Sequence, residues 1–246
     1  MDSIARLRVL DSEECRAVRD TVIGLRRHWQ RRSAEYPFFT LGAASYLDAP
    51  GSRERYIEKA LDENRLLAGH FGWVYERLAG VLAGHFGADV EYAGNLALPG
   101  YHIYLSHPAF ELPIASIHCD TQYRLLEWPF ASADFGKAMS FTLAIALPRS
   151  GAGLRVWPFH HDEIAGETLQ ALLRRAATRR RTTFPTKRGT PPFIPGIACT
   201  RPRPPRASSQ ATSGSPCRAT RSSETAAGCF IGEPHALPVV ARPGHG

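Results

Sequence analysis

Residues 117–121 read Ile117-His118-Cys119-Asp120-Thr121 and lie among short segments with the composition of β-strands. Residues two positions apart on a strand point to the same face, so His118 and Asp120 are predicted to project side by side. An imidazole and a carboxylate placed in this way are two ligands of the 2-His-1-carboxylate arrangement that holds Fe(II). The residues alone leave a second interpretation open, in which the pair ends a strand in a solvated turn.

Apolar and aromatic segments on both sides of this motif predict a set of strands. Turn-forming residues separate these segments, at Pro99-Gly100, at 106–108 and at 148–151. The predicted strands are Val90–Tyr92, Tyr101–Leu105, Ile114–Cys119, Ser140–Leu147 and Leu154–Trp157.

The residues before this region predict helices. Asp11 or Ser12, followed by Glu13 and Glu14, is typical of a helix start. A second helix is predicted over 63–85, because apolar residues recur there at steps of three and four. They are Leu67, Phe71, Val74, Leu78, Val81 and Leu82. Helices followed by short strands favour an α+β fold whose strands close into a barrel or jelly roll.

The charge of the chain divides it into two parts. The chain has 246 residues and a formal net charge of +7. Residues 181–246 carry nine Lys or Arg and only two acids, and they hold 11 of the 19 prolines. The first 180 residues carry no net charge and are numerous enough to bury a sizeable core. We therefore predict a folded domain over 1–180 and a Pro/Arg-rich tail over 181–246.

The remaining composition excludes several classes of protein. Five cysteines at irregular spacing, without a Cys-X-X-Cys pair, argue against a disulfide framework and a zinc knuckle. No apolar run approaches the roughly 20 residues of a membrane span. The first residues lack the pattern of a signal peptide, so we expect a cytoplasmic chain without a membrane partner.

The motifs of residues 90–160, taken together, resemble those of the 2-oxoglutarate/Fe(II)-dependent dioxygenases. They are the His118-Cys119-Asp120 strand, the long apolar strand Ser140–Leu147, and the Gly-rich turn into Leu154-Arg155-Val156-Trp157. The resemblance implies a double-stranded β-helix (jelly roll) with helices packed on it. It also implies a hydroxylase that uses Fe(II) and the co-substrate 2-oxoglutarate, with His118 and Asp120 as iron ligands.

Tyr104 is a further candidate for the site. A tyrosine hydroxyl on a barrel strand is within reach of the co-substrate's carboxylate, so we expect Tyr104 to contact 2-oxoglutarate. The alternative is a tyrosine packed in the core with a satisfied hydroxyl. The other large aromatic residues, Trp73, Trp128 and Trp157, are predicted to pack in the interior.

The chain departs from the family pattern after Trp157. Nothing there matches the distal His that supplies the third iron ligand, or the Arg that pairs with 2-oxoglutarate. His160 and His161 fall in a predicted loop, where a solvated pair is the expected interpretation. The jelly roll is therefore expected to be incomplete at the C-terminus.

The composition of the tail is typical of a GC-rich coding region translated in the wrong frame. With codons read one base earlier, residues 194–200 permit the string H-S-G-H-R-L-H, and residues 211–220 permit G-D-E-R-I-T-L-P-G-H. Residues 225–232 permit D-G-G-W-L-L-Y-W, and the next shifted codon can be a stop. These strings look like the family's distal segments, so we hypothesise a frameshift. A genuine disordered basic tail is the alternative.

Three functions are compatible with these observations. The first is an oxygenase acting on a small molecule or peptide of unknown identity, inactive in this form if the distal residues are lost. The second is a barrel that binds metal without oxygenase activity. The third is a binding module whose basic tail contacts nucleic acid. No aromatic residue lies among Arg201, Arg203, Arg206, Arg218 and Arg221, so the tail offers no platform for stacking bases and we do not expect nucleic acid as a partner.

Overall fold

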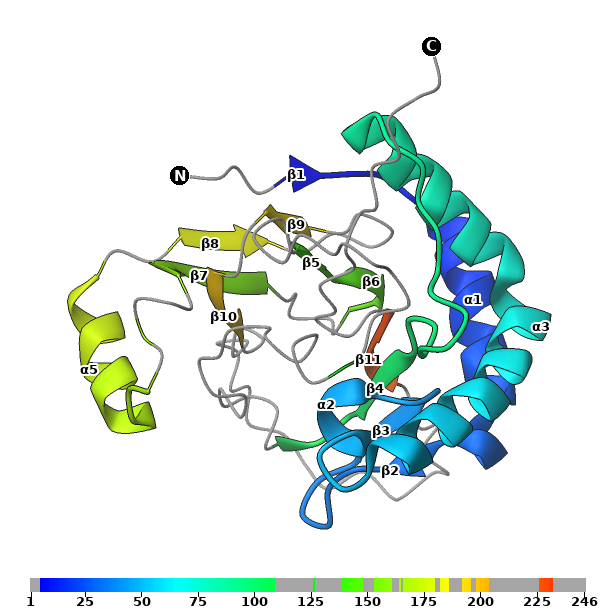
Figure 1. Ribbon diagram of the computed structural model, residues 1–246, viewed down its shortest axis with the longest axis horizontal. Helices are drawn as coiled ribbons and strands as arrows, with labels where there is room; N and C mark the ends of the chain where they lie inside the picture. Colours follow the sequence, from blue (N-terminus) through cyan, green and yellow to red (C-terminus); the bar gives the residue numbers. More distant parts are fainter. Residues whose placement is uncertain are drawn as a thin grey trace, which may run out of the picture.

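The computed structural model of the chain (Figure 1) combines two long helices with antiparallel sheets. The structure describes residues 5–108, 126, 139–147, 153–160, 164, 166–179, 182–185, 192–195, 198–203 and 226–231. Every statement below concerns these residues. His118, Asp120, Trp128 and His161 lie outside them, as does the whole of the predicted strand over 114–119.

The first helix begins where the sequence predicts. Helix α1 spans Ser12–Gly24, and the Asp11 side chain accepts hydrogen bonds from the N–H groups of Glu13 and Glu14. The Glu14 side chain accepts from the Asp11 N–H in return, which completes a capping box. Cys15, Val18 and Val22 form its buried face, and a short 3-10 turn, η1 (Arg26–His28), follows.

The second long helix starts earlier than predicted. Helix α3 spans Arg53–Phe86, because Ser52 caps its N-terminus and the residues after it continue the buried stripe through Tyr56 and Ala60. It ends at Gly87, whose φ of 63° is the left-handed conformation of a helix C-cap. A single helical turn, α2 (Ser45–Asp48), precedes it and was not predicted.

A five-stranded antiparallel sheet lies against these helices. Its order is β2-β3-β4-β11-β6. The strands are β2 (Gln30–Arg31), β3 (Phe38–Leu41), β4 (Tyr101–Leu105), β11 (Ala226–Ile231) and β6 (Leu143–Ala146). In the pairing of β3 with β4, Phe38 lies opposite Tyr104 and Thr40 opposite His102.

Two three-stranded sheets complete the described strands. One has the order β1-β9-β5, from Ala5–Arg6, Pro192–Pro195 and Met139–Phe141. The other has the order β10-β7-β8, from Ala198–Arg203, Gly153–His160 and Thr182–Pro185. Figure 1 shows β7, β8 and β10 on the side of the molecule away from α1 and α3. The pairings of the described residues make three open sheets and do not confirm the jelly-roll barrel.

The main core fills the space between the helices and one face of the five-stranded sheet. Leu41, Tyr101 and Ile103 are fully buried there. The Tyr101 ring lies 4.6 Å from that of Phe71 on α3. Because side chains alternate across a strand, Phe38, Thr40, His102 and Tyr104 fall on the opposite side, which we call the inner face. This arrangement confirms the predicted α+β class.

Two glycines allow the ends of β3 and β4 to approach closely. A Cβ on Gly100 would lie 2.7 Å from the Leu41 carbonyl oxygen, which no real Cβ tolerates. Gly42 has a φ of 97°, and its Cβ would lie 2.8 Å from Leu67 on α3. Both positions therefore require glycine for β3, β4 and α3 to lie this close to one another.

A smaller helix packs beside β7. Helix α5 spans Leu169–Thr178, and the side chain of Thr168 caps its N-terminus. The Trp157 indole donates a hydrogen bond to the Ala176 carbonyl at 3.1 Å and is 3% exposed, so its predicted place in the interior is confirmed. Trp157, Leu172 and Ala176 form a cluster separate from the main core.

Several predictions for individual segments differ from the structure. Residues 90–92 form no strand. The predicted strand over 140–147 is two strands, β5 and β6, which belong to different sheets. His160 ends β7 instead of lying in a loop. Trp73 is 39% exposed on α3, with the Arg77 guanidinium 5.4 Å from its ring, so its predicted packing in the interior is wrong. Within the described residues, no helix is long and apolar enough to cross a membrane.

Candidate functional site

The inner face of β3 and β4 carries a row of rings. Tyr104 stacks on Phe38, with ring centroids 4.7 Å apart and planes inclined by only 5°. The His102 ring follows at 5.9 Å from Phe38, and Tyr46 of α2 lies 5.8 Å from His102. We call Tyr104, Phe38, His102 and Tyr46 the aromatic row. The strand register sets Phe38 directly opposite Tyr104, and His102 lies two residues before Tyr104 on the same face of β4.

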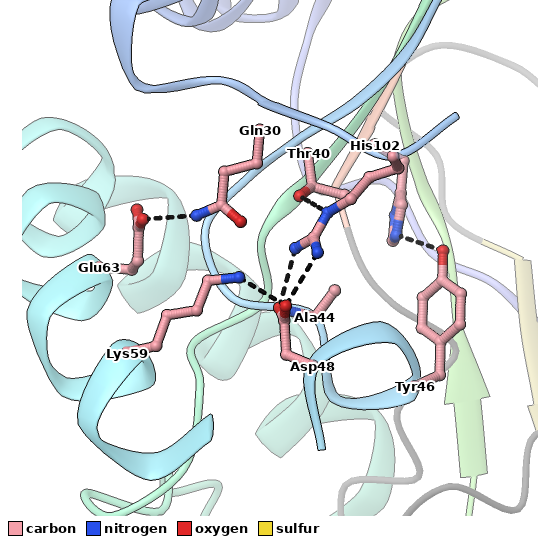
Figure 2. A network of polar contacts seen from close by, with 9 residues as sticks. Gln30, Thr40, Ala44, Tyr46, Asp48, Lys59, Glu63 and His102 are labelled. Atoms are coloured by element: carbon pink, nitrogen blue, oxygen red, sulfur yellow. Dashed lines mark hydrogen bonds and ion pairs between the residues drawn. The ribbon is translucent and has the colours of Figure 1, made fainter. Parts of the chain in front are cut away.

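The row is polar at one end. The Tyr46 hydroxyl and the His102 Nε2 are 3.1 Å apart and share a hydrogen bond, which Figure 2 shows. His102 is buried, as is its cross-strand neighbour Thr40. A hydroxyl and an imidazole can each donate or accept in a hydrogen bond, so the row ends in a polar pair.

A partly buried ion cluster holds α2 in place beside the row. Arg32 donates two hydrogen bonds to the Asp48 carboxylate, each of 2.8 Å, and a third to the Thr40 hydroxyl. Lys59 of α3 donates to the same carboxylate at 2.6 Å, and the Ala44 N–H donates at 2.7 Å. Figure 2 shows Asp48 at the centre of these contacts. The cluster therefore ties α2 to β3 and to α3.

The pKa of Asp48 reflects these contacts. Burial alone would raise it, but the hydrogen bonds from Arg32, from the Ala44 N–H and from Lys59 favour the charged form and lower the pKa to about 2. Asp48 is therefore ionised at neutral pH. The side chains of Arg32 and Asp48 are each only 11% exposed, so the pair is protected from solvent.

Tyr104 occupies the opposite end of the row. Burial, with a smaller contribution from nearby Tyr36, raises the pKa of its hydroxyl above the ordinary value of 10.0. The hydroxyl is therefore protonated at neutral pH. The structure places Tyr104 on the inner face, away from the main core, and leaves its predicted contact with 2-oxoglutarate untested.

The predicted iron ligands, His118 and Asp120, lie outside the described residues, so the structure does not bring them together with Tyr104 or separate them from it. Within the described part of the chain, no group of three or more His, Cys, Asp or Glu side chains is arranged to hold a metal ion. The two-ligand site remains a prediction from sequence.

Sequence reasoning missed most of the residues that surround the aromatic row. The alternation of Tyr101 to Tyr104 already sets residues 102 and 104 on one face, so His102 was within reach of sequence analysis. Arg32, Asp48 and Lys59 come from three separate segments, and no periodic pattern links them. Only the folded chain reveals that cluster.

Comparisons with known proteins give a weak structural likeness and nothing at the level of sequence. No protein-family model and no curated protein matches the chain. Among solved structures, "non-heme alpha ketoglutarate dependent carbocyclase SnoK from nogalamycin biosynthesis" aligns with a TM-score of 0.44 and 11% identity. The alignment covers 99% of this chain and 90% of the other.

The "non-heme alpha ketoglutarate dependent epimerase SnoN from nogalamycin biosynthesis" aligns with a TM-score of 0.40 and 15% identity, over 94% of this chain and 76% of the other. A structure of SnoN with Fe3+, alpha ketoglutarate and nogalamycin RO aligns with a TM-score of 0.39 and 15% identity, over 100% and 87%. All three scores are below 0.5, so we draw no conclusion about function from them.

Proposed function

We propose that this chain is a 2-oxoglutarate- and Fe(II)-dependent oxygenase, a hydroxylase in which His118 and Asp120 hold the iron. The observation that carries the proposal is the His-X-Asp motif, which the sequence sets between β4 and β5. One imidazole and one carboxylate are a donor set suited to Fe(II). When bound, iron and 2-oxoglutarate together supply the activation of O₂, with release of succinate and CO₂.

Tyr104 is proposed to contact the co-substrate. Tyr104 lies on the inner face of β4, which ends at Leu105, before the motif in sequence, and its raised pKa keeps its hydroxyl protonated. A protonated hydroxyl donates to a carboxylate, which is the group that 2-oxoglutarate would present. The jelly-roll barrel implied by the sequence resemblance belongs to the same proposal, as do a small-molecule or peptide substrate and a cytoplasmic location.

A binding measurement tests the metal site directly. We expect Mn(II), used as a redox-stable substitute for Fe(II), to bind the purified chain weakly in calorimetry, because only two protein ligands are identified. His118→Ala and Asp120→Ala are expected to lower that affinity at least about tenfold. His70→Ala and Asp89→Ala remove the same groups from exposed positions and should leave it unchanged. Equal affinity in all four variants would refute the site.

We further propose that this form is inactive because the distal His and the Arg for 2-oxoglutarate are missing. The nucleotide sequence across codons 170–235, read in all three frames, is the test. A shifted frame that encodes a distal His, an Arg-Ile-Thr-Leu strand and an early stop supports the frameshift. A continuous open frame without such segments contradicts it.

Two other outcomes would favour the alternatives. Binding of Mn(II) without any further effect of 2-oxoglutarate would indicate a metal-binding barrel that is not an oxygenase. Salt-dependent binding of a duplex oligonucleotide, lost when the arginines of the tail are replaced, would indicate a binding module with a basic tail.

A further inference from the structure

Helix α3 exposes two large apolar side chains. Leu61 is 41% exposed and Trp73 is 39% exposed, although the helix that carries them buries its opposite side in the main core. The Arg77 guanidinium lies over the Trp73 ring, 5.4 Å from its centroid, and leaves the rest of the ring open. Figure 1 shows α3 at the margin of the molecule, with α1 beside it. Single exposed apolar residues are common, so the residues between these two decide what the surface can do.

Between Leu61 and Trp73 the outer side of α3 is nearly bare. Gly69 is exposed and Gly72 is half-buried, and a Cβ at either position would meet nothing within 4 Å in this chain. Glycine inside a helix is less stable than alanine, and no contact in this chain requires glycine at these two positions. What the two glycines do allow is the close approach of another helix.

The outer side of α3 follows the spacing of a coiled coil. Steps of three and four residues, alternating, connect six positions that are exposed or half-buried. Such a seven-residue repeat keeps one side of a helix turned towards a partner helix along its length. We call these residues the outer seam: Asp62, Arg65, Gly69, Gly72, Glu76 and Ala79.

The charges of the outer seam are complementary to those of a second copy. An antiparallel α3 with the two-fold axis between Gly69 and Gly72 sets Arg65 of each copy opposite Glu76 of the other. The two ion pairs are equivalent, as two-fold symmetry requires. A parallel helix would instead set Arg65 against Arg65 and Glu76 against Glu76, so the charges select the antiparallel arrangement.

The sizes of the side chains are complementary in the same arrangement. Leu61 of one copy comes beside Ala79 of the other, and Trp73 comes beside Gly69. Each large exposed side chain is therefore set against a small residue, which is how closely packed antiparallel helices fill the space between them.

We propose that two copies of this chain form a dimer through the outer seam, with antiparallel α3 helices that cross at Gly69 and Gly72. Within one chain Arg65 pairs with Asp62 at 3.2 Å, but the two side chains are 80% and 73% exposed, so exchanging that pair for Glu76 of a second copy costs little. The dimer goes beyond the proposed function, and it requires neither metal nor 2-oxoglutarate.

Charge reversal tests the pairing of Arg65 with Glu76. In sedimentation equilibrium of the full chain, we expect the mass to rise with concentration from that of one chain to that of two. Arg65→Glu and Glu76→Arg each set like charges opposite one another and should weaken the dimer at least about tenfold. The combined variant reverses both charges and should restore the dimer. Arg16→Glu and Glu35→Arg reverse exposed charges outside the outer seam and are the controls that should change nothing.

A substitution at the crossing point tests the close approach. Gly69→Leu removes the glycine, and its Cβ meets nothing in the same chain. Leucine also favours a helix more than glycine does, so thermal unfolding at a concentration where the chain is monomeric should show no loss of stability. The dimer, by contrast, should weaken at least about tenfold, because the added side chain separates the helices.

A mass of one chain at every concentration would overturn the proposal and leave this face to some other occupant. A dimer that none of the seam variants weakens would also overturn it, as would a dimer that stays weak in the combined charge reversal, since either result places the contact elsewhere. These measurements use no Mn(II) and no 2-oxoglutarate. Failure of the dimer is therefore distinguishable from failure of the proposed metal site.

Discussion

At the scale of single residues, a Gly→Ala substitution should destabilise the fold at one glycine and stabilise it at another. Gly100→Ala forces a Cβ to within 2.7 Å of the Leu41 carbonyl oxygen, so we expect a loss of about 1–3 kcal/mol in the free energy of unfolding. Gly80→Ala, inside α3, meets nothing within 4 Å and should add about 0.5–1 kcal/mol. Urea denaturation of both variants measures the difference. The same sign for both would contradict this account.

The residues of the candidate site could be predicted from the sequence only in part. The alternation of β4 sets Tyr104 and His102 on one face, as its sequence implies. His118 and Asp120 follow from a local spacing rule and stay a prediction, because they lie outside the described residues. Tyr46 could not have been found in this way. Tyr46 reaches His102 because the turn that carries it, α2, is held by Asp48. The Asp48 carboxylate binds Arg32, which follows β2, and Lys59 of α3. Contacts of that range leave no periodic signal in the sequence.

At the scale of elements, the Asp48 cluster determines whether α2 stays docked. Asp48→Asn keeps the shape of the side chain but leaves Arg32 and Lys59 without their counter-charge, so we expect a loss of about 2–3 kcal/mol in the free energy of unfolding. Asp62→Asn is the matched control. Its pair with Arg65 is 73–80% exposed and should matter by less than about 0.5 kcal/mol. Similar effects of the two substitutions would argue against a protected cluster.

The same cluster predicts a dependence of stability on pH. The pKa of Asp48 is about 2 in the folded chain against an ordinary value of 3.8, so the folded state favours the carboxylate. Its contribution, about 2 kcal/mol, is present above pH 3.8 and is lost as the pH falls towards 2. The stability difference between the wild type and Asp48→Asn should therefore shrink over that range. A difference that stays constant between pH 6 and pH 2 would contradict the assignment.

Elements with strong local signals were predicted well, and those fixed by distant partners were not. The capping box of Asp11 and Glu14 marks α1, and the aromatic run marks β4 with the observed bounds. The start of α3 was missed because Tyr56 and Ala60, the buried residues of its first turns, are separated by a gap from Leu67, where the predicted apolar stripe begins. The break between β5 and β6 is invisible in a continuous apolar segment, since their partners β9 and β11 lie far along the chain.

At the scale of the whole molecule, the difference in size between the main core and the cluster under α5 predicts two levels of stability. The main core joins α1, α3 and the five-stranded sheet, whereas Trp157, Leu172 and Ala176 form a small cluster under α5. We expect amides of residues 67–78 to exchange hydrogen only through global unfolding and those of α5 to exchange faster, through local opening. Trp157→Phe removes the bond to the Ala176 carbonyl and should speed exchange in α5 alone. Equal protection of both helices would contradict this division.

The α+β class followed from the order of the sequence patterns, helices first and strands after them. The closure of strands into a barrel did not follow, because it depends on pairings between distant segments, and the described pairings form three open sheets.

In the sequence, α3 lies between β3 and β4, although these two strands are neighbours in the sheet, and this order affects the sequence of folding steps. β3 pairs along its whole length with β4, yet residues 42–100 separate the two strands in the sequence. Their ladder therefore requires the closure of a long loop, whereas α3 forms from contacts within one segment. We expect refolding to produce the α3 helix first and the β3–β4 ladder late. Loop closure would then set the rate at which the aromatic row is assembled.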